Sequence, residues 1–394
     1  MKAVEISPKV YWVGAKDWNR RVFDALISLP RGTSYNSYLI VGDEKTALID
    51  TVYKDFEGNL GEKVNEVLDL GDIDYIIMNH AEPDHSGAIP YILKQNTKVS
   101  VVTTKKGAEI AKAYYDLPDE RLIIVREGDE VSLGGKTLRF IEAPWLHWPE
   151  TMFTYLLEDK ILFTCDFFGA HIADGLYDDE VPDIMVHAQR YFGEIMMPFS
   201  SMVRKALQKI EGLDVDMIAP SHGPIYRNPQ RIIDAHKKWS RGETQEKVLI
   251  VYVSMYGTNE EIARKLADRL IAEGIEVEVY DLVSSDIGDI AKDLVDSRAI
   301  VLAAPTVLAG AHPLAVYAAY LVKALRPPAK YALLIGSHGW YGKSNDALLE
   351  MLKGLNFELI GTLDIHARPS AGDYNEFLRL TDLLIKRLRR GEDD

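Results

Sequence analysis

One short stretch of the chain holds four side chains able to bind a metal within six residues. These are His80, Glu82, Asp84 and His85, and they directly follow an apolar run typical of a buried strand. Pro83 lies among them, and because proline lacks a backbone N–H and fixes φ, we predict that the stretch is a loop rather than a helix. Imidazole and carboxylate together suit iron, manganese or zinc. The alternative is a solvated acidic loop with two incidental histidines.

Three further side chains of the same kinds follow other apolar runs. His147, Asp166 and His222 each come where a predicted buried strand opens into a loop. Taken singly, a histidine at a strand end is more often an ordinary loop residue. Loops at strand ends can turn several side chains toward one point, so the set as a whole predicts a metal centre. The predicted ligands are His80, Glu82, Asp84, His147, Asp166 and His222.

The composition narrows the functions that such a centre could serve. The chain has 394 residues, enough for two or three domains, and a net charge of −15, which argues against a broad nucleic-acid surface. Cys165 is the only cysteine, so neither a disulfide within the chain nor a cysteine cluster can form. The first residues lack a signal peptide's apolar core, and no apolar run reaches the roughly 18 residues needed to span a bilayer. We expect a cytoplasmic protein that acts on a small molecule, without nucleic-acid or membrane partners.

The pattern of apolar runs divides the chain into two domains. Residues 1–246 alternate short β-rich runs with turns and a few helical segments, which predicts an α+β fold of two sheets with helices outside them, a four-layer αββα sandwich. The polar, glycine-bearing stretch 237–246 is typical of a linker. Residues 247–394 alternate buried strands with helices, which predicts an α/β doubly wound parallel sheet.

Three loops of the second domain lie at the carboxyl ends of strands, where doubly wound sheets bind ligands. The first offers hydroxyls, an amide and backbone N–H groups at a helix start, which suits a phosphate monoester. It contains neither lysine nor arginine, so it is not a P-loop. Glycines in the other two let the backbone approach a planar ring, and an aromatic side chain there could stack on it. The predicted binding residues are Ser254, Met255, Tyr256, Gly257, Thr258 and Asn259; Pro305, Thr306, Val307, Leu308, Ala309 and Gly310; and Ser337, His338, Gly339, Trp340, Tyr341 and Gly342.

The ligand series of the first domain resembles that of the metallo-β-lactamase fold. That superfamily usually has His-x-His-x-Asp-His in its first motif and binds zinc for hydrolysis, whereas this chain has Glu82 at the second position. The exchange replaces a neutral nitrogen with an anionic oxygen, which makes the ligand set harder and suits a pair of irons. The resemblance implies one metal on His80, Glu82 and His147, a second on Asp84 and His222, and Asp166 between them. It leaves His85 over, and we expect His85 beside the centre rather than as a ligand.

The second domain resembles a flavodoxin, with FMN held by the three loops. A carboxylate-rich metallo-β-lactamase-like domain followed by a flavodoxin-like domain resembles the flavodiiron proteins, also called A-type flavoproteins, over nearly the whole chain. The resemblance implies a reductase of dioxygen to water or of nitric oxide to nitrous oxide, in which FMN passes electrons to a diiron centre. It also implies a rubredoxin or similar electron donor and a head-to-tail homodimer, and it leaves open whether dimers pair into a tetramer.

One motif of the family is altered in this chain. The stretch Gly-Thr-[Thr/Ser]-Tyr-Asn-Ser-Tyr is intact at residues 32–38, but the earlier Phe-His-Gly reads Phe23-Asp24-Ala25. The family's histidine faces the substrate pocket, so Asp24 bears on proton supply and on the choice of gas. The predicted groups around the pocket are Asp24, His85, His171 and Tyr191.

Two other functions are compatible with parts of the pattern. A dinuclear zinc hydrolase with an attached FMN domain would keep the metal-binding residues, but Glu82 argues against it. A non-catalytic electron carrier would keep FMN and have a vestigial metal site, which the complete ligand series argues against.

Overall fold

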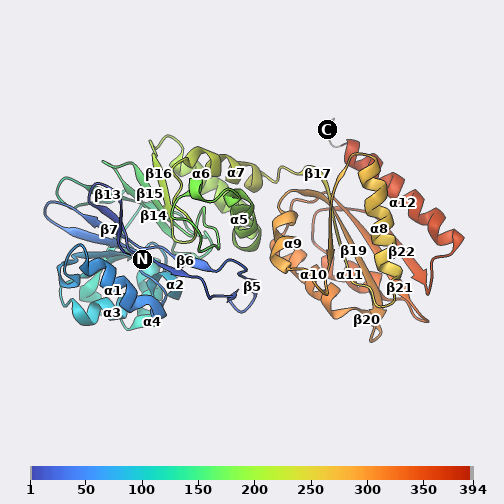
Figure 1. The fold of residues 1–394 in the computed structure, drawn as a ribbon, viewed down its shortest axis with the longest axis horizontal. Coiled ribbons are helices and arrows are strands. Elements are labelled where there is room, and N and C mark those ends of the chain that lie inside the picture. Colours follow the sequence, from blue (N-terminus) through green and yellow to red (C-terminus); the bar gives the residue numbers. More distant parts are fainter. Residues whose placement is uncertain (1, 391–394) are drawn as a thin grey trace. The chain divides into compact units, whose positions relative to one another are not determined.

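The computed structural model describes residues 2–390, which form two compact units. The first unit comprises residues 2–191 and 199–237, and the second comprises residues 192–198 and 238–390. Figure 1 shows sheets and helices in both units. No helix within the described range combines the length and apolar composition that crossing a membrane requires.

The first unit contains a seven-stranded and a five-stranded sheet. In spatial order the larger sheet consists of β1 (Val4–Ser7), β2 (Val10–Trp12), β7 (Tyr38–Val41), β8 (Thr46–Ile49), β9 (Tyr75–Ile77), β10 (Ser100–Thr104) and β11 (Leu122–Val125). The smaller consists of β12 (Glu130–Ser132), β13 (Thr137–Glu142), β14 (Met152–Leu156), β15 (Ile161–Cys165) and β16 (Met217–Pro220). Two short ribbons pair β3 (Ala15–Asp17) with β6 (Thr33–Tyr35) and β4 (Val22–Phe23) with β5 (Ile27–Ser28).

The two sheets pack face to face, as the alternating pattern predicted. Trp12, Ile49 and Ile77 of the larger sheet share one buried cluster with Phe140 and Phe163 of the smaller sheet. Helices flank the pair (Figure 1), namely α1 (Glu57–Asn65), α2 (Pro83–Ser86), α3 (Ile89–Gln95), α4 (Lys105–Tyr115), α5 (Ile184–Tyr191), α6 (Ser200–Ile210) and α7 (Pro229–Arg241). The predicted αββα sandwich is therefore confirmed.

The second unit is a parallel sheet covered on both faces. The order is β18 (Glu276–Asp281), β17 (Gln245–Tyr252), β19 (Ser297–Val307), β21 (Tyr331–His338) and β22 (Glu358–His366), and β20 (Gly310–Ala311) pairs antiparallel with the end of β19. The helices are α8 (Thr258–Ala272), α9 (Ile287–Leu294), α10 (Pro313–Leu325), α11 (Ser344–Leu352) and α12 (Ala371–Arg390). Because the strand order reverses beside β17, the loops after β17 and β19 open the crevice where such sheets bind ligands.

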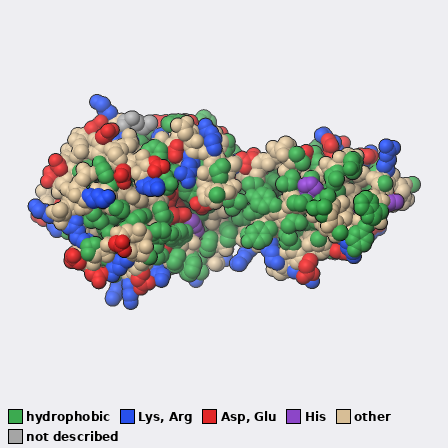
Figure 2. All heavy atoms as spheres, turned by 90° about the horizontal axis from the view of Figure 1, so that it is seen from below, with side chains coloured by type: hydrophobic (Ala, Val, Ile, Leu, Met, Phe, Trp, Pro, Cys, Tyr) green, Lys and Arg blue, Asp and Glu red, His purple; other side chains and the backbone are tan. Residues whose placement is uncertain are grey.

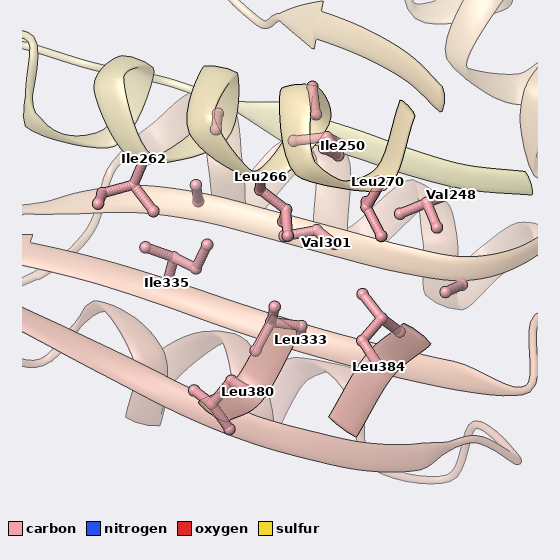
Figure 3. Close-up of a cluster of buried hydrophobic side chains, with 14 of the residues drawn as sticks. Val248, Ile250, Ile262, Leu266, Leu270, Val301, Leu333, Ile335, Leu380 and Leu384 are labelled. Atoms are coloured by element: carbon pink, nitrogen blue, oxygen red, sulfur yellow. The ribbon is translucent and has the colours of Figure 1, made fainter. Parts of the chain in front are cut away.

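One core of the second unit lies between the sheet and the helices α8 and α12. Figure 3 shows Ile262, Leu266 and Leu270 of α8 and Leu380 and Leu384 of α12 directed at the strands. These apolar residues recur at helical spacing, which is why the sequence pattern located both helices. The doubly wound prediction is confirmed, and the loops of interest are fixed to a packed scaffold.

One local prediction was wrong, and a second located the boundary between the units, at Lys238, but not the regular structure there. The stretch around Pro83 is not a loop, because Pro83 begins helix α2 with Glu82 as its N-cap residue. Proline is tolerated there since the first turn of a helix does not use that N–H. The predicted linker is also mostly regular, because α7 continues to Arg241 and β17 begins at Gln245. The buried side chains of His236 and Ser240, one helical turn apart, show why the polar composition misled.

Candidate functional site

The predicted metal-binding side chains converge in the first unit, each at the end of a strand or in α2. His80 and Glu82 follow β9, and α2 then carries Asp84 and His85. His147 lies in the loop between β13 and β14. Asp166 directly follows β15, and His222 lies two residues past the end of its parallel neighbour β16. Their ligand atoms gather into two groups, one of His80, Glu82, His147 and Asp166, the other of Asp84, His85 and His222, with all atoms of a group within 4.8 Å of one another.

The first group surrounds the Oε2 atom of Glu82. His80 Nε2 lies 3.1 Å and His147 Nε2 lies 3.2 Å from that oxygen. In the second group His222 Nε2 lies 3.1 Å from Asp84 Oδ2. Each group therefore presents imidazole nitrogens and a carboxylate oxygen toward a common point, as one metal position would require.

Asp166 joins the two groups through its two oxygens. Its Oδ2 lies 3.0 Å from His147 Nε2 and 3.4 Å from His80 Nε2. Its Oδ1 lies 2.9 Å from His85 Nε2 and 3.4 Å from His222 Nε2. One buried carboxylate thus faces both positions, which is the arrangement expected of a bridge between two metal ions.

His85 lies beside Asp84 in the second group. Its Nε2 is 3.3 Å from Asp84 Oδ2, within the second group, rather than displaced from it. Its side chain is completely buried. Whether His85 is a ligand or supports one stays a prediction.

The unsatisfied atoms at the centre fit bound cations. Both oxygens of Asp84, both ring nitrogens of His85 and Oδ1 of Asp166 are buried and form no well-oriented hydrogen bond with any described residue. Buried polar groups without partners are costly and rare in native proteins. Two cations at the positions defined above would satisfy these atoms, so the residues present fit a dinuclear metal centre.

In the metal-free site the carboxylates and the histidines shift one another's pKa values. Burial would lower the pKa of His85, but the carboxylates of Asp84 and Asp166 outweigh burial and raise it to about 9. Burial likewise opposes the shift at His147, where hydrogen bonds to Asp166 and Glu82 raise the pKa to about 9. Burial alone would raise the pKa of Asp166, yet the neighbouring histidine charges hold it well below its ordinary value. Without metal, protons on the imidazoles therefore balance the carboxylates.

This balance predicts how the metal-free protein responds to pH. A histidine whose pKa rises on folding stabilises the fold fully below about pH 6.5, and the contribution is lost as the pH rises through about 9. We expect the free energy of unfolding of chelator-treated protein to fall over that interval, by on the order of 3 kcal/mol for each of the two histidines. Urea denaturation at the two ends of the interval measures it. His147→Gln should flatten the decline, and unfolding free energy that rises with pH would contradict the prediction.

The other predicted pocket residues lie around the second group. The ring of His171 is 4.8 Å from that of Tyr191 and 4.7 Å from that of His222. Burial and the charge of His222 keep the pKa of His171 well below its ordinary value, and burial keeps the pKa of Tyr191 well above its own. His171 is therefore neutral, and the Tyr191 hydroxyl keeps its proton.

Asp24 lies at the tip of the β4–β5 ribbon, with its side chain exposed. The preceding Phe23 is buried, with its ring 4.7 Å from that of His171. Desolvation by the neighbouring protein atoms and the charges of Glu82 and Asp84 raise the pKa of Asp24, although its side chain reaches solvent. Asp24 is therefore an acid at the edge of the site, within electrostatic reach of the metal-binding carboxylates.

The sequence did not reveal the residues that hold the metal-binding histidines in place. Glu150 Oε1 accepts a hydrogen bond from His80 Nδ1 at 2.7 Å. The backbone oxygen of Ser34 lies 2.6 Å from His222 Nδ1, and the hydroxyl oxygen of Thr33 lies 3.3 Å from the same nitrogen. Thr33 and Ser34 belong to the intact family motif, so that signal was available, whereas nothing local links Glu150 to His80, 70 residues away.

The first predicted loop of the second unit leads into helix α8, whose N-terminus has no side-chain cap. Gly257 precedes α8 with φ of 88°, a left-handed conformation that favours glycine, and no side chain caps the helix. Ser254 Oγ instead accepts the N–H of Gly257 at 3.1 Å. The free N–H groups of the first turn of α8 and the positive end of its dipole form an anion site that fits a phosphate.

The three predicted loops are tied together by hydrogen bonds. Thr306 Oγ1 accepts the backbone N–H groups of Lys343 at 3.0 Å and Ser344 at 3.2 Å, which joins the second loop to the residues directly after the third. Thr258 Oγ1 donates to the carbonyl of Ala367 at 2.8 Å, and the Ala367 N–H donates to the carbonyl of His338 at 2.8 Å. The segment after β22 therefore links the first loop to the third, which the sequence analysis did not foresee.

Large apolar side chains stand out from these loops. Tyr256, Leu308 and Trp340 are 92%, 91% and 94% exposed. Figure 2 views the second unit from the side where β20 lies, and apolar side chains gather there. Such exposure of large apolar groups around a predicted cofactor site suits contact with a planar ring and with another protein surface.

Two family models match the chain in agreement with the two units. The model described as "ODP family beta lactamase" matches residues 33–223, and the model "Flavodoxin" matches residues 250–379. The first covers all the predicted metal-binding residues, and the second covers all three loops. The flavodoxin match implies FMN as a cofactor of the second unit.

Named relatives share both parts in one chain. A "Nitric oxide reductase" of Moorella thermoacetica is 42% identical over 91% of each chain. A "Type A flavoprotein fprA" of Rhodobacter capsulatus is 35% identical over 95% of this chain and 88% of its own. The solved structure of rubredoxin oxygen:oxidoreductase from Desulfovibrio gigas matches with a TM-score of 0.96 and 29% identity over all of both chains. These relatives are oxidoreductases and flavoproteins, so the zinc hydrolase alternative is not favoured. The chain belongs to the flavodiiron, or type A flavoprotein, family.

Proposed function

We propose that the protein reduces nitric oxide or dioxygen at a pair of irons that receive electrons from FMN. The observation that carries this proposal is the convergence of four imidazoles, one of them His85, and three carboxylates, with Asp166 facing both groups. Glu82 and Asp84 give each position an anionic oxygen, which suits iron in more than one oxidation state better than it suits zinc. The relative named nitric oxide reductase and the structure named rubredoxin oxygen:oxidoreductase support the same reaction class.

Each metal-binding residue has a proposed place. His80, Glu82 and His147 would hold one iron, Asp84 and His222 the other, and Asp166 both, with His85 beside the second. When bound, the irons supply electrons and Lewis acidity to the gas. The strand ends and α2 keep the two groups at a fixed separation, so that both positions face one diatomic molecule or a pair of them.

The reaction also consumes protons, which the chain can supply. Reducing two molecules of nitric oxide to nitrous oxide and water takes two electrons and two protons, and reducing dioxygen to two waters takes four of each. Tyr191 keeps its proton and lies with His171 beside the second group. Asp24, whose pKa is raised, occupies the edge of the site. We assign Tyr191, His171 and Asp24 to proton supply and hydrogen bonding in the pocket.

FMN would lie at the carboxyl ends of the second sheet. Its phosphate fits the first turn of α8, and its ring fits between loops 305–310 and 337–342. The hydrogen bonds through Thr306 and Thr258 hold these loops in place, which lowers the ordering cost of binding. A rubredoxin-type protein is the proposed electron donor, since the similar structure from Desulfovibrio gigas is named for one.

We further propose a head-to-tail homodimer in which one subunit's FMN serves the other subunit's metal centre. Tyr256, Leu308 and Trp340 are exposed large apolar side chains of the kind that proteins bury in contacts. Sedimentation of the FMN-loaded protein should give twice the 44.3 kDa mass of the chain. A monomer at micromolar concentration would contradict this arrangement.

Anaerobic turnover with each gas in separate runs tests the proposed reaction. Protein loaded with iron and FMN is reduced chemically and mixed rapidly with nitric oxide or with dioxygen. We expect flavin reoxidation, with nitrous oxide as the product in the first run and water without released peroxide in the second. Reduced protein inert to both gases would contradict the proposal and favour the electron-carrier alternative.

A further inference from the structure

Glu150 is a buried carboxylate directed at the metal centre from outside. Its side chain is completely buried, and Oε1 accepts two hydrogen bonds, from His80 Nδ1 at 2.7 Å and from the backbone N–H of Ala81 at 3.0 Å. The other oxygen, Oε2, is buried and has no hydrogen-bond partner among the described residues. Thr104 Oγ1 donates to the Glu150 carbonyl at 3.1 Å and fixes the backbone. Burying a carboxylate oxygen without a hydrogen-bond partner costs folding free energy, so a buried Glu150 suggests a functional role.

The hydrogen bond between His80 Nδ1 and Glu150 determines which nitrogen of His80 can bind a metal. When Nδ1 carries the proton that is donated to Glu150, the lone pair of Nε2 is left for a metal. Nε2 points to the first group, 3.1 Å from Glu82 Oε2 and 3.4 Å from Asp166 Oδ2. Glu150 therefore fixes both the tautomer of His80 and the direction in which its free nitrogen points.

The second metal position has no corresponding carboxylate. His222 Nδ1 lies 2.6 Å from the carbonyl oxygen of Ser34, a neutral acceptor. Glu82 and Asp84 contribute one carboxylate to each position, and Asp166 is shared. Besides the number of imidazoles, the two ligand sets therefore differ in the negative charge of Glu150 behind His80. A carboxylate behind an imidazole makes the imidazole a stronger donor.

We propose that Glu150 is a positioning residue that orients His80 and makes the His80 position the more electron-rich of the two. This inference rests on the proposed diiron function. It follows that the iron held by His80, Glu82 and His147 is the harder one to reduce, so the first electron that the pair accepts goes to the position of Asp84 and His222.

The test uses full-length protein loaded with FMN and isotopically enriched iron. Glu150→Gln keeps the size and a hydrogen-bond acceptor but removes the charge, and Glu150→Asp keeps the charge but shortens its reach. Glu120→Gln, at an exposed glutamate, is the matched control. Iron affinity, the midpoint potentials of the iron pair and the Mössbauer spectrum of the half-reduced pair are measured without either gas.

We expect Glu150→Gln to raise the midpoint potential of the iron that is reduced second, because a negative charge near it is removed. The Mössbauer spectra of the two iron sites should become more alike. Iron should bind about 10-fold more weakly, within the range seen for partners of metal-bound histidines. Glu150→Asp should weaken iron binding with a smaller change in potential. Potentials and spectra in Glu150→Gln equal to those of the control would overturn the inference. These measurements use neither gas, so they test the role of Glu150 separately from the reaction. Wild-type protein that holds two irons but reduces neither gas would contradict the proposed function and leave the inference about Glu150 standing.

Discussion

Replacing Asp166 with asparagine should release both metal ions and abolish gas reduction while FMN stays bound. Each oxygen of Asp166 faces a different metal position, Oδ2 toward His147 at 3.0 Å and Oδ1 toward His85 at 2.9 Å. Asparagine keeps the volume but turns one acceptor into an N–H donor and removes the charge that both positions share. The loss of a direct ligand should exceed the 10- to 100-fold loss typical of a ligand's supporting residue, so we expect iron affinity to fall by more than about 100-fold.

The measurement is iron and flavin content after expression with ample iron, followed by turnover with each gas. Asp55→Asn replaces an exposed aspartate of the same unit and should keep both cofactors. Loss of FMN together with iron from Asp166→Asn would mean that the two units do not bind their cofactors independently. Retention of two irons would show that Asp166 does not bridge them.

The Thr258→Pro variant should lose most of its affinity for FMN while its iron content stays unchanged. Thr258 is the first residue of α8, where proline fits the backbone but removes one N–H from the predicted phosphate site. A hydrogen bond to a charged group contributes about 1.5–3 kcal/mol, so we expect FMN to bind about 10- to 150-fold more weakly. Titration of the flavin-free protein, followed by quenching of flavin fluorescence, measures the change.

Thr258→Val is the matched control for this variant. It keeps the backbone N–H and loses only the hydroxyl that donates to the Ala367 carbonyl at 2.8 Å. We expect valine to weaken FMN binding less than proline does, because it loosens the loops without removing a phosphate donor. Equal affinity of the proline variant and the wild type would show that the phosphate lies elsewhere.

The sequence located most of the side chains that the structure brings together, because the local pattern around each of them is distinctive. His147, Asp166 and His222 each interrupt an apolar run where a strand ends, so the local pattern locates them at sheet edges. The sequence could not show that Oδ1 and Oδ2 of Asp166 face different groups, because that depends on how the sheets pack. The sequence also could not show that α2 turns the ring of His85 toward Asp84 and Asp166.

The supporting contacts were beyond sequence reasoning because they join residues that are far apart in the chain. Glu150 reaches His80 across 70 residues, and Thr258 reaches Ala367 across 109. The error at Pro83 has a different cause, because the local sequence allows two interpretations. Proline breaks the interior of a helix, but it is also favoured in the first turn, where the structure has it. The polar stretch near residue 240 was misread because a helix with one buried face can be polar elsewhere.

Anomalous diffraction at the iron absorption edge, from crystals of protein expressed with ample iron, tests the central claim most directly. We expect two iron peaks in each chain, one among His80, Glu82 and His147 and one beside Asp84 and His222, with Asp166 touching both. A single peak, peaks elsewhere, or zinc alone at these positions would contradict a diiron centre built from these side chains.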